Sequence, residues 1–109
     1  MCVQTCVHRP HIRQEVVWEG IVAPEVELQI DVILSKLGLF RSPNRKIFLE
    51  RVLNEHFKCL LGLDLLSLSY NKKNPSMLIL EQSKPLYIVL QLEIAFIAFL
   101  NSVVGVLPR

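Results

Sequence analysis

Apolar residues recur with a helical period in two stretches of the chain. In residues 24–37 they fall at positions i, i+4, i+7 and i+8 counted from Val26, and residues 43–61 show a comparable apolar stripe. A proline suits the first turn of each stretch. Each stretch ends in a glycine followed by leucine, at Gly38 and Gly62, which is typical of a left-handed helix cap. Because the connection is short, the pattern predicts an antiparallel helical hairpin.

A different period follows the second helix. Leu66, Leu68 and Tyr70 alternate with serines, as in a strand with one buried face. The run over residues 71–76 is rich in turn formers and precedes another apolar stretch. The pattern therefore indicates a short β-hairpin over about residues 65–81.

The chain divides at Pro24 and after Pro85. Residues 1–23 are interpreted as an irregular N-terminal arm, residues 24–85 as a small helical domain with the hairpin, and residues 86–109 as an apolar C-terminal segment. Ile12, Gln14, Val16 and Trp18 share one face if the arm is extended, which permits a strand without requiring one. The predicted fold class is mainly α.

Residues 86–107 contain no Lys or Arg and a single carboxylate, Glu93. A helix of that length spans about 33 Å, close to the hydrocarbon thickness of a bilayer. The segment is predicted to be a long apolar helix that crosses a membrane, with Glu93 as its polar position. The lysines that precede it place the N-terminal domain in the cytoplasm.

A second interpretation keeps the same segment in water-soluble protein. The segment is then a buried helix, or a strand over residues 86–99, and a cytoplasmic location follows. One domain in a chain of 109 residues covers such a helix poorly, so a partner subunit or self-association is expected to complete its burial. Both interpretations stay open at the level of sequence.

Net charge and the cysteine and histidine residues indicate which ligands and which cellular environment to expect. A net charge of +2 is too small to indicate nucleic-acid binding. The three cysteines are an odd number without two closely spaced pairs, which argues against a disulfide framework and for a reducing compartment. Cys2, Cys6, His8 and His11 are the right ligand types for zinc, although their spacing is not that of a zinc finger. The alternative is a frayed terminus with incidental residues.

Three cations surround the start of the second predicted helix. Arg41, Arg45 and Lys46 lie where free backbone N–H groups and the helix dipole attract anions, so they are candidate contacts for an anion or an acidic partner. The alternative is a solvated loop. Farther along, His56 and Cys59 share one side of the helix, and we expect a boundary histidine and a packed cysteine.

No catalytic signature, nucleotide loop or cofactor motif is present, and the sequence identifies no small-molecule substrate. The sequence favours a non-enzymatic protein-interaction module anchored to a membrane by its C-terminal segment. The first alternative is a soluble subunit of a homo- or hetero-oligomeric complex with that segment buried in the interface. The second alternative is a zinc-dependent regulatory module built on the N-terminal arm.

Overall fold

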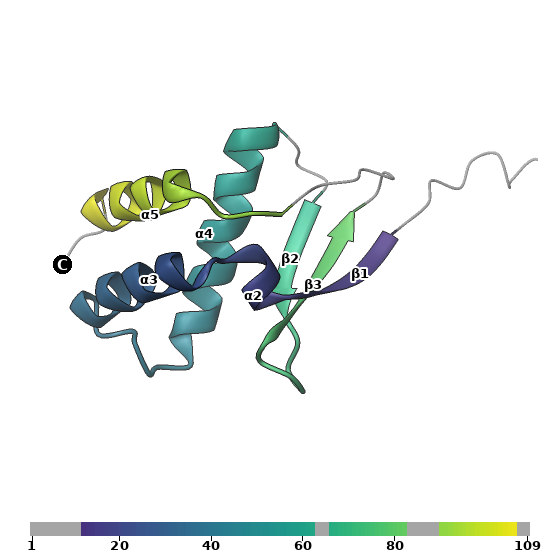
Figure 1. Cartoon of the computed structure of the whole chain (residues 1–109), viewed down its shortest axis with the longest axis horizontal. Coiled ribbons are helices and arrows are strands. Elements are labelled where there is room, and N and C mark those ends of the chain that lie inside the picture. Colours follow the sequence, from purple (N-terminus) through teal and green to yellow (C-terminus); the bar gives the residue numbers. More distant parts are fainter. Residues whose placement is uncertain (1–11, 63–65, 83–89, 107–109) are drawn as a thin grey trace, which may run out of the picture.

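The structure is a computed structural model that describes residues 12–62, 66–82 and 90–106. The larger helices lie on one side of the molecule and a sheet lies on the other (Figure 1). In chain order the described elements are β1 (Ile12–Val17), α2 (Trp18–Ile21), α3 (Pro24–Lys36), α4 (Asn44–Leu61), β2 (Leu66–Tyr70), β3 (Met77–Gln82) and α5 (Ile94–Val106).

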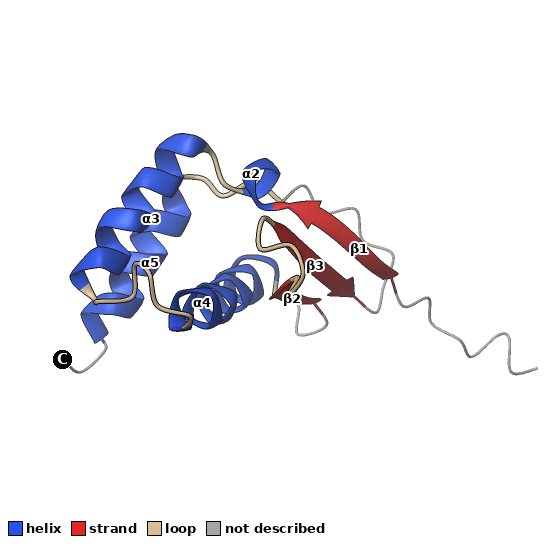
Figure 2. Ribbon diagram, turned by 90° about the horizontal axis from the view of Figure 1, so that it is seen from below, coloured by secondary structure: helices blue, strands red, loops and turns tan. Residues whose placement is uncertain are grey.

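The strands form an antiparallel sheet in the order β1-β3-β2. Side chains alternate strictly along the central strand: Leu78 and Leu80 are buried, whereas Met77 and Ile79 are half-buried. Only one face of the sheet therefore packs against the helices, and this pattern is the usual one for an antiparallel sheet with helices on one side (Figure 2).

The prediction of a mainly α fold is wrong, because the molecule is a mixed α/β fold with a three-stranded sheet. Strands β2 and β3 correspond to the hairpin expected over residues 65–81. Strand β1 lies in the arm assigned to residues 1–23, where the sequence permitted a strand without requiring one, and it pairs Ile12 with Gln82. A pairing between such distant segments leaves no local signal beyond the alternation of its own side chains.

Helices α3 and α4 occupy the two stretches with helical periodicity. Pro24 is the first residue of α3, and Glu25 and Glu27 favour its positive end. The glycine stops are confirmed: Gly38 has φ 72° and Gly62 has φ 64°, and both conformations strain any residue with a Cβ.

The two helices do not form the predicted antiparallel hairpin. Helix α4 runs across α3, and α5 lies beside α3 instead (Figures 1 and 2). Phe96 and Leu100 of α5 are fully buried in the same core as Ile30 and Leu34 of α3. The apolar stripe of α3 thus packs against a helix that begins 58 residues after α3 ends.

The long helix predicted over residues 86–107 is also wrong. Helix α5 has 13 residues, which amounts to about 20 Å, and the segment before it is extended, with the Leu92 N–H donating to the Ile21 carbonyl at 2.7 Å. Among the residues that the structure describes, no helix has the length and apolarity to span a membrane. The membrane localisation derived from that helix therefore loses its basis.

Side chains of α4 close the β2 edge of the sheet. The Leu68 N–H donates to Asn54 Oδ1 at 2.9 Å, and Asn54 Nδ2 donates to the Leu68 carbonyl at 3.0 Å. One turn earlier on α4, Glu50 Oε1 accepts the Tyr70 N–H. Both outward backbone groups of Leu68 and the outward N–H of Tyr70 are therefore bonded to helix side chains, so they cannot pair with another strand.

Replacing Asn54 by alanine leaves the backbone N–H and carbonyl of Leu68 without partners. Leu68 is buried, so we expect the free energy of unfolding to fall by about 1–3 kcal/mol, measured by urea denaturation. The exposed neighbour provides the control, since Glu55→Ala is expected to change the stability little. Equal stability of the Asn54→Ala and Glu55→Ala variants would contradict this assignment.

Candidate interaction surfaces

A groove of about 420 Å³ lies between α4 and α5. Leu60 on its α4 side is 64% exposed. The groove contains no Asp, Glu, Lys or Arg side chain and is lined by His56, Cys59, Leu60, Ala95, Ala98 and Phe99. An open and uncharged concavity with an exposed leucine on its wall is suited to apolar contact.

The outer face of α5 continues this uncharged surface. Ile94, the first residue of α5, is 78% exposed, and Ala98 follows one turn later on the same side. Over residues 95–105, where the burial of the side chains is described, the other exposed residues of the helix are small and neutral: Ala95, Asn101, Ser102 and Gly105. Helix α5 therefore buries one face in its own core and offers the other face without charge and with little steric bulk.

His56 forms the floor of the groove and contributes no charge at neutral pH. Its side chain is 7% exposed and contacts Phe57, Phe96 and Phe99, with ring centroids between 5.1 and 5.5 Å away. Desolvation by burial lowers the pKa of His56 from 6.5, because the imidazolium would lose its hydration among aromatic rings.

The sequence did not predict how His56 and Cys59 are buried. The histidine expected at the boundary is buried, and the cysteine expected to be packed is exposed. Helical spacing placed both residues on one side of α4. It gave no signal for Phe99 of α5, which covers the histidine and leaves the thiol outside.

Arg45, a candidate anion contact, joins α4 to α3. Its guanidinium donates to Glu27 Oε1 at 3.0 Å and to Asp31 Oδ1 at 2.9 Å. The side chains of these residues are 20–31% exposed, so the ion pairs are partly shielded from water. The other oxygen of Glu27 accepts the indole N–H of Trp18 at 2.6 Å. The network therefore links α2, α3 and α4.

The three cations of that cluster lie against two aromatic rings. Arg41 and Arg45 lie 5.9 and 5.6 Å from the ring centroid of Phe40, whereas Lys46 lies 5.9 Å from that of Tyr70. Burial, and after it the charge of Glu27, raises the pKa of Tyr70 well above its usual value, so its hydroxyl stays neutral. Arg41 and Arg45 thus share one aromatic ring and Lys46 lies over another, and anion binding by the three residues stays a prediction.

The remaining candidate residues lie at the two ends of the chain. Cys2, Cys6, His8 and His11 fall outside the described residues, so the zinc site stays untested. Within residues 12–62, 66–82 and 90–106, no group of three or more His, Cys, Asp or Glu side chains is placed to hold a metal ion. Glu93 is exposed directly before α5, where its carbonyl accepts the Phe96 N–H at 2.9 Å.

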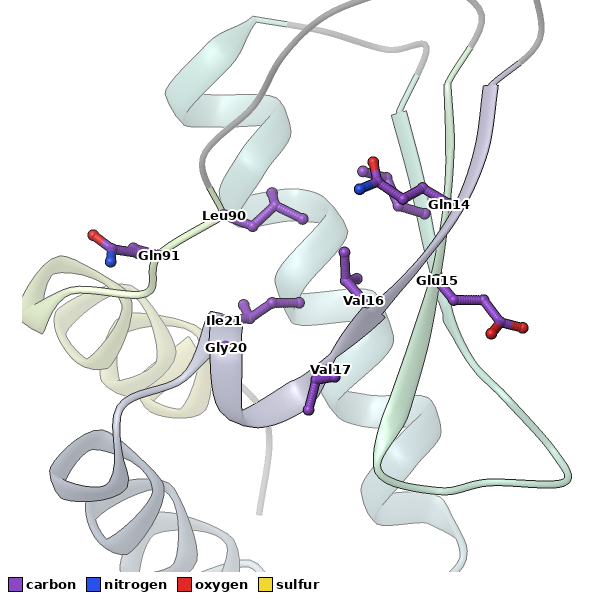
Figure 3. Close-up of a pocket in the computed structure, with 9 residues that line it drawn as sticks. Gln14, Glu15, Val16, Val17, Gly20, Ile21, Leu90 and Gln91 are labelled. Carbon is purple, nitrogen blue, oxygen red and sulfur yellow. The ribbon is translucent and has the colours of Figure 1, made fainter.

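A second hollow, of about 440 Å³, lies beside the edge strand β1. Gln14 and Val16 of β1 point toward Ile21 and Leu90 across this hollow, whereas Glu15 points to the opposite side of the strand (Figure 3). In the described part of the chain, no strand pairs with the outer edge of β1.

Comparison of the chain with models of protein families, with curated proteins and with solved structures finds no match. The functional argument therefore rests on the surfaces themselves.

The lowered pKa of His56 makes stability depend on pH. The unfolded chain takes up a proton near pH 6.5 and the folded chain does so only at a lower pH, so the free energy of unfolding falls as the pH drops through that value. The slope is at most about 1.4 kcal/mol per pH unit. Urea denaturation between about pH 7.5 and 5.5 measures it. His56→Gln is expected to flatten this dependence, and an unchanged slope in that variant would contradict the assignment.

The ion pairs of Arg45 predict a second stability effect. Arg45→Met keeps much of the side-chain volume but leaves Glu27 and Asp31 without their cation, so we expect a loss of about 1–3 kcal/mol. Arg41→Met removes an exposed positive charge four residues away and is expected to cost far less. Thermal and urea unfolding of both variants provide the comparison, and equal losses would show that the network does not hold the helices together.

Proposed function

We propose that this chain is a non-enzymatic subunit of a protein complex and that it binds its partner through the α4–α5 groove and the outer face of α5. The observation that carries the proposal is the uncharged groove flanked by Leu60 and Ile94, which are 64% and 78% exposed. Contact with a partner would remove both large side chains from water, where their exposure is unfavourable.

The shape of this surface favours an apolar helix or side-chain ridge as the binding element. Ala95 and Ala98 leave the backbone of α5 accessible along the groove, so a second helix can approach it closely. His56 is neutral at physiological pH because of its lowered pKa, so an apolar partner meets no charge on the groove floor. These features support a protein partner.

The proposal retains the alternative derived from the sequence, in which the C-terminal segment is part of an interface. It replaces membrane anchoring, for which the described helices are too short or too polar. One face of α5 is already used by the core around Phe96 and Leu100. The interface is therefore expected to involve only the outer face of the helix.

Ala98→Glu is the sharpest test of this proposal. The substitution adds a charge and bulk within the groove at an exposed position of a helix that tolerates glutamate. Gln29→Glu adds the same charge at an exposed position of α3 and serves as the matched control. We expect proteins that copurify with the tagged full-length chain to decrease at least tenfold with Ala98→Glu and to stay unchanged with Gln29→Glu.

Circular dichroism of both variants verifies that they are folded. Recovery of the same proteins in the same amounts with Ala98→Glu would overturn the proposal. So would the absence of any protein that distinguishes the two variants.

A further inference from the structure

We propose that the outer edge of β1 pairs with β1 of a second copy of this chain, antiparallel and with the two-fold axis at Gln14. The two sheets would then join into one continuous sheet across the dimer. This inference is independent of the proposed function, because β1 lies on the far side of the sheet from α4 and its groove (Figure 1).

The register of the sheet fixes which backbone groups point outward. The Trp18 N–H donates to the Ser76 carbonyl at 2.9 Å, which continues the β1–β3 ladder past the end of the strand. Because bonding alternates along an antiparallel strand, the even-numbered positions of β1 bond to β3. The N–H and carbonyl groups of Arg13, Glu15 and Val17 therefore face away from the sheet.

The two edges of the sheet differ in availability. On the β2 edge, Asn54 and Glu50 occupy the outward backbone groups of Leu68 and Tyr70. On the β1 edge, no such bonds exist to any residue that the structure describes. An open edge of this kind is the usual site of strand addition.

Charge complementarity selects a second copy as the occupant. With the axis at Gln14, Arg13 lies opposite Glu15 of the second copy, and Glu15 lies opposite its Arg13. Ile12 lies opposite Val16 on the other face. Shifting the axis by one residue to Arg13 or to Glu15 places like charges directly opposite each other, which is unfavourable. The order of charges in β1 is thus self-complementary in a single register about its centre.

The residues around the outer edge of β1 are also compatible with antiparallel pairing centred on Gln14. Ile12 of the second copy would lie beside Val16, next to the hollow lined by Ile21 and Leu90, and would fill part of it (Figure 3). On the opposite face Arg13 already lies 3.7 Å from Glu81, so the second copy's Glu15 would give it another carboxylate partner.

Charge reversal tests the interface by sedimentation. Arg13→Glu alone and Glu15→Arg alone each place like charges in both cross-strand pairs, so each variant is expected to dimerise at least tenfold more weakly than the original chain. Mixing the two variants places opposite charges in both pairs and is expected to restore the dimer. A chain that is monomeric at every concentration tested would overturn the proposal, as would a mixture that associates no better than its components.

Cysteine crosslinking tests the register in the full-length chain with Cys2, Cys6 and Cys59 replaced by serine. Gln14→Cys places the two cysteines directly opposite each other in a non-hydrogen-bonded pair. Their Cα atoms are then about 4.5 Å apart, within the range of a disulfide. Arg13→Cys serves as the control, because the Cα atoms of the two cysteines are then about 8 Å apart, too far for a disulfide. We expect mild oxidation to give a crosslinked dimer with Gln14→Cys and at least tenfold less with Arg13→Cys. Equal yields would reject the register.

Discussion

The carboxamide of Asn54, bonded to both backbone groups of Leu68, sets the relation between the helical and sheet parts of this molecule. It acts as a substitute for the next strand, because it offers one acceptor and one donor at the spacing of a backbone amide. Once α4 is held at this edge, its opposite side is directed toward α5. The core then closes around Phe57, Phe96 and Leu100.

With α4 held at the β2 edge, two surfaces of the described molecule remain available for binding another protein. The β1 edge has outward backbone groups with alternating charges, and the α4–α5 groove has an uncharged wall. Directional hydrogen bonds and ion pairs favour a second copy at the first surface, whereas nondirectional apolar burial favours a different protein at the second. A subunit with one self-pairing surface and one partner surface would bring two copies of that partner together.

The sequence predicted the features that depend only on contacts between residues close together in the chain. The glycine stops at Gly38 and Gly62 and the turn over residues 71–76 depend on neighbouring residues, and the structure contains all three. The sequence pattern permitted β1 but could not require it, because its pairing partner β3 is distant in the chain. It overestimated the C-terminal helix because Leu90 and Leu92 are buried in an extended segment, in which Leu92 bonds to Ile21 and bridges to Val22, residues far from it in sequence. Uniform apolarity indicates burial and leaves the choice between strand, extended segment and helix to the tertiary structure.

Hydrogen exchange of individual backbone amides, measured by NMR as a function of protein concentration, tests the difference between the two sheet edges most directly. The amides of Leu68 and Tyr70 are expected to be protected at every concentration, because α4 accepts their hydrogen bonds within one chain. Those of Arg13 and Glu15 are expected to exchange rapidly in dilute solution and to become protected as the concentration rises. Protection of Arg13 and Glu15 that does not change with concentration would contradict the account.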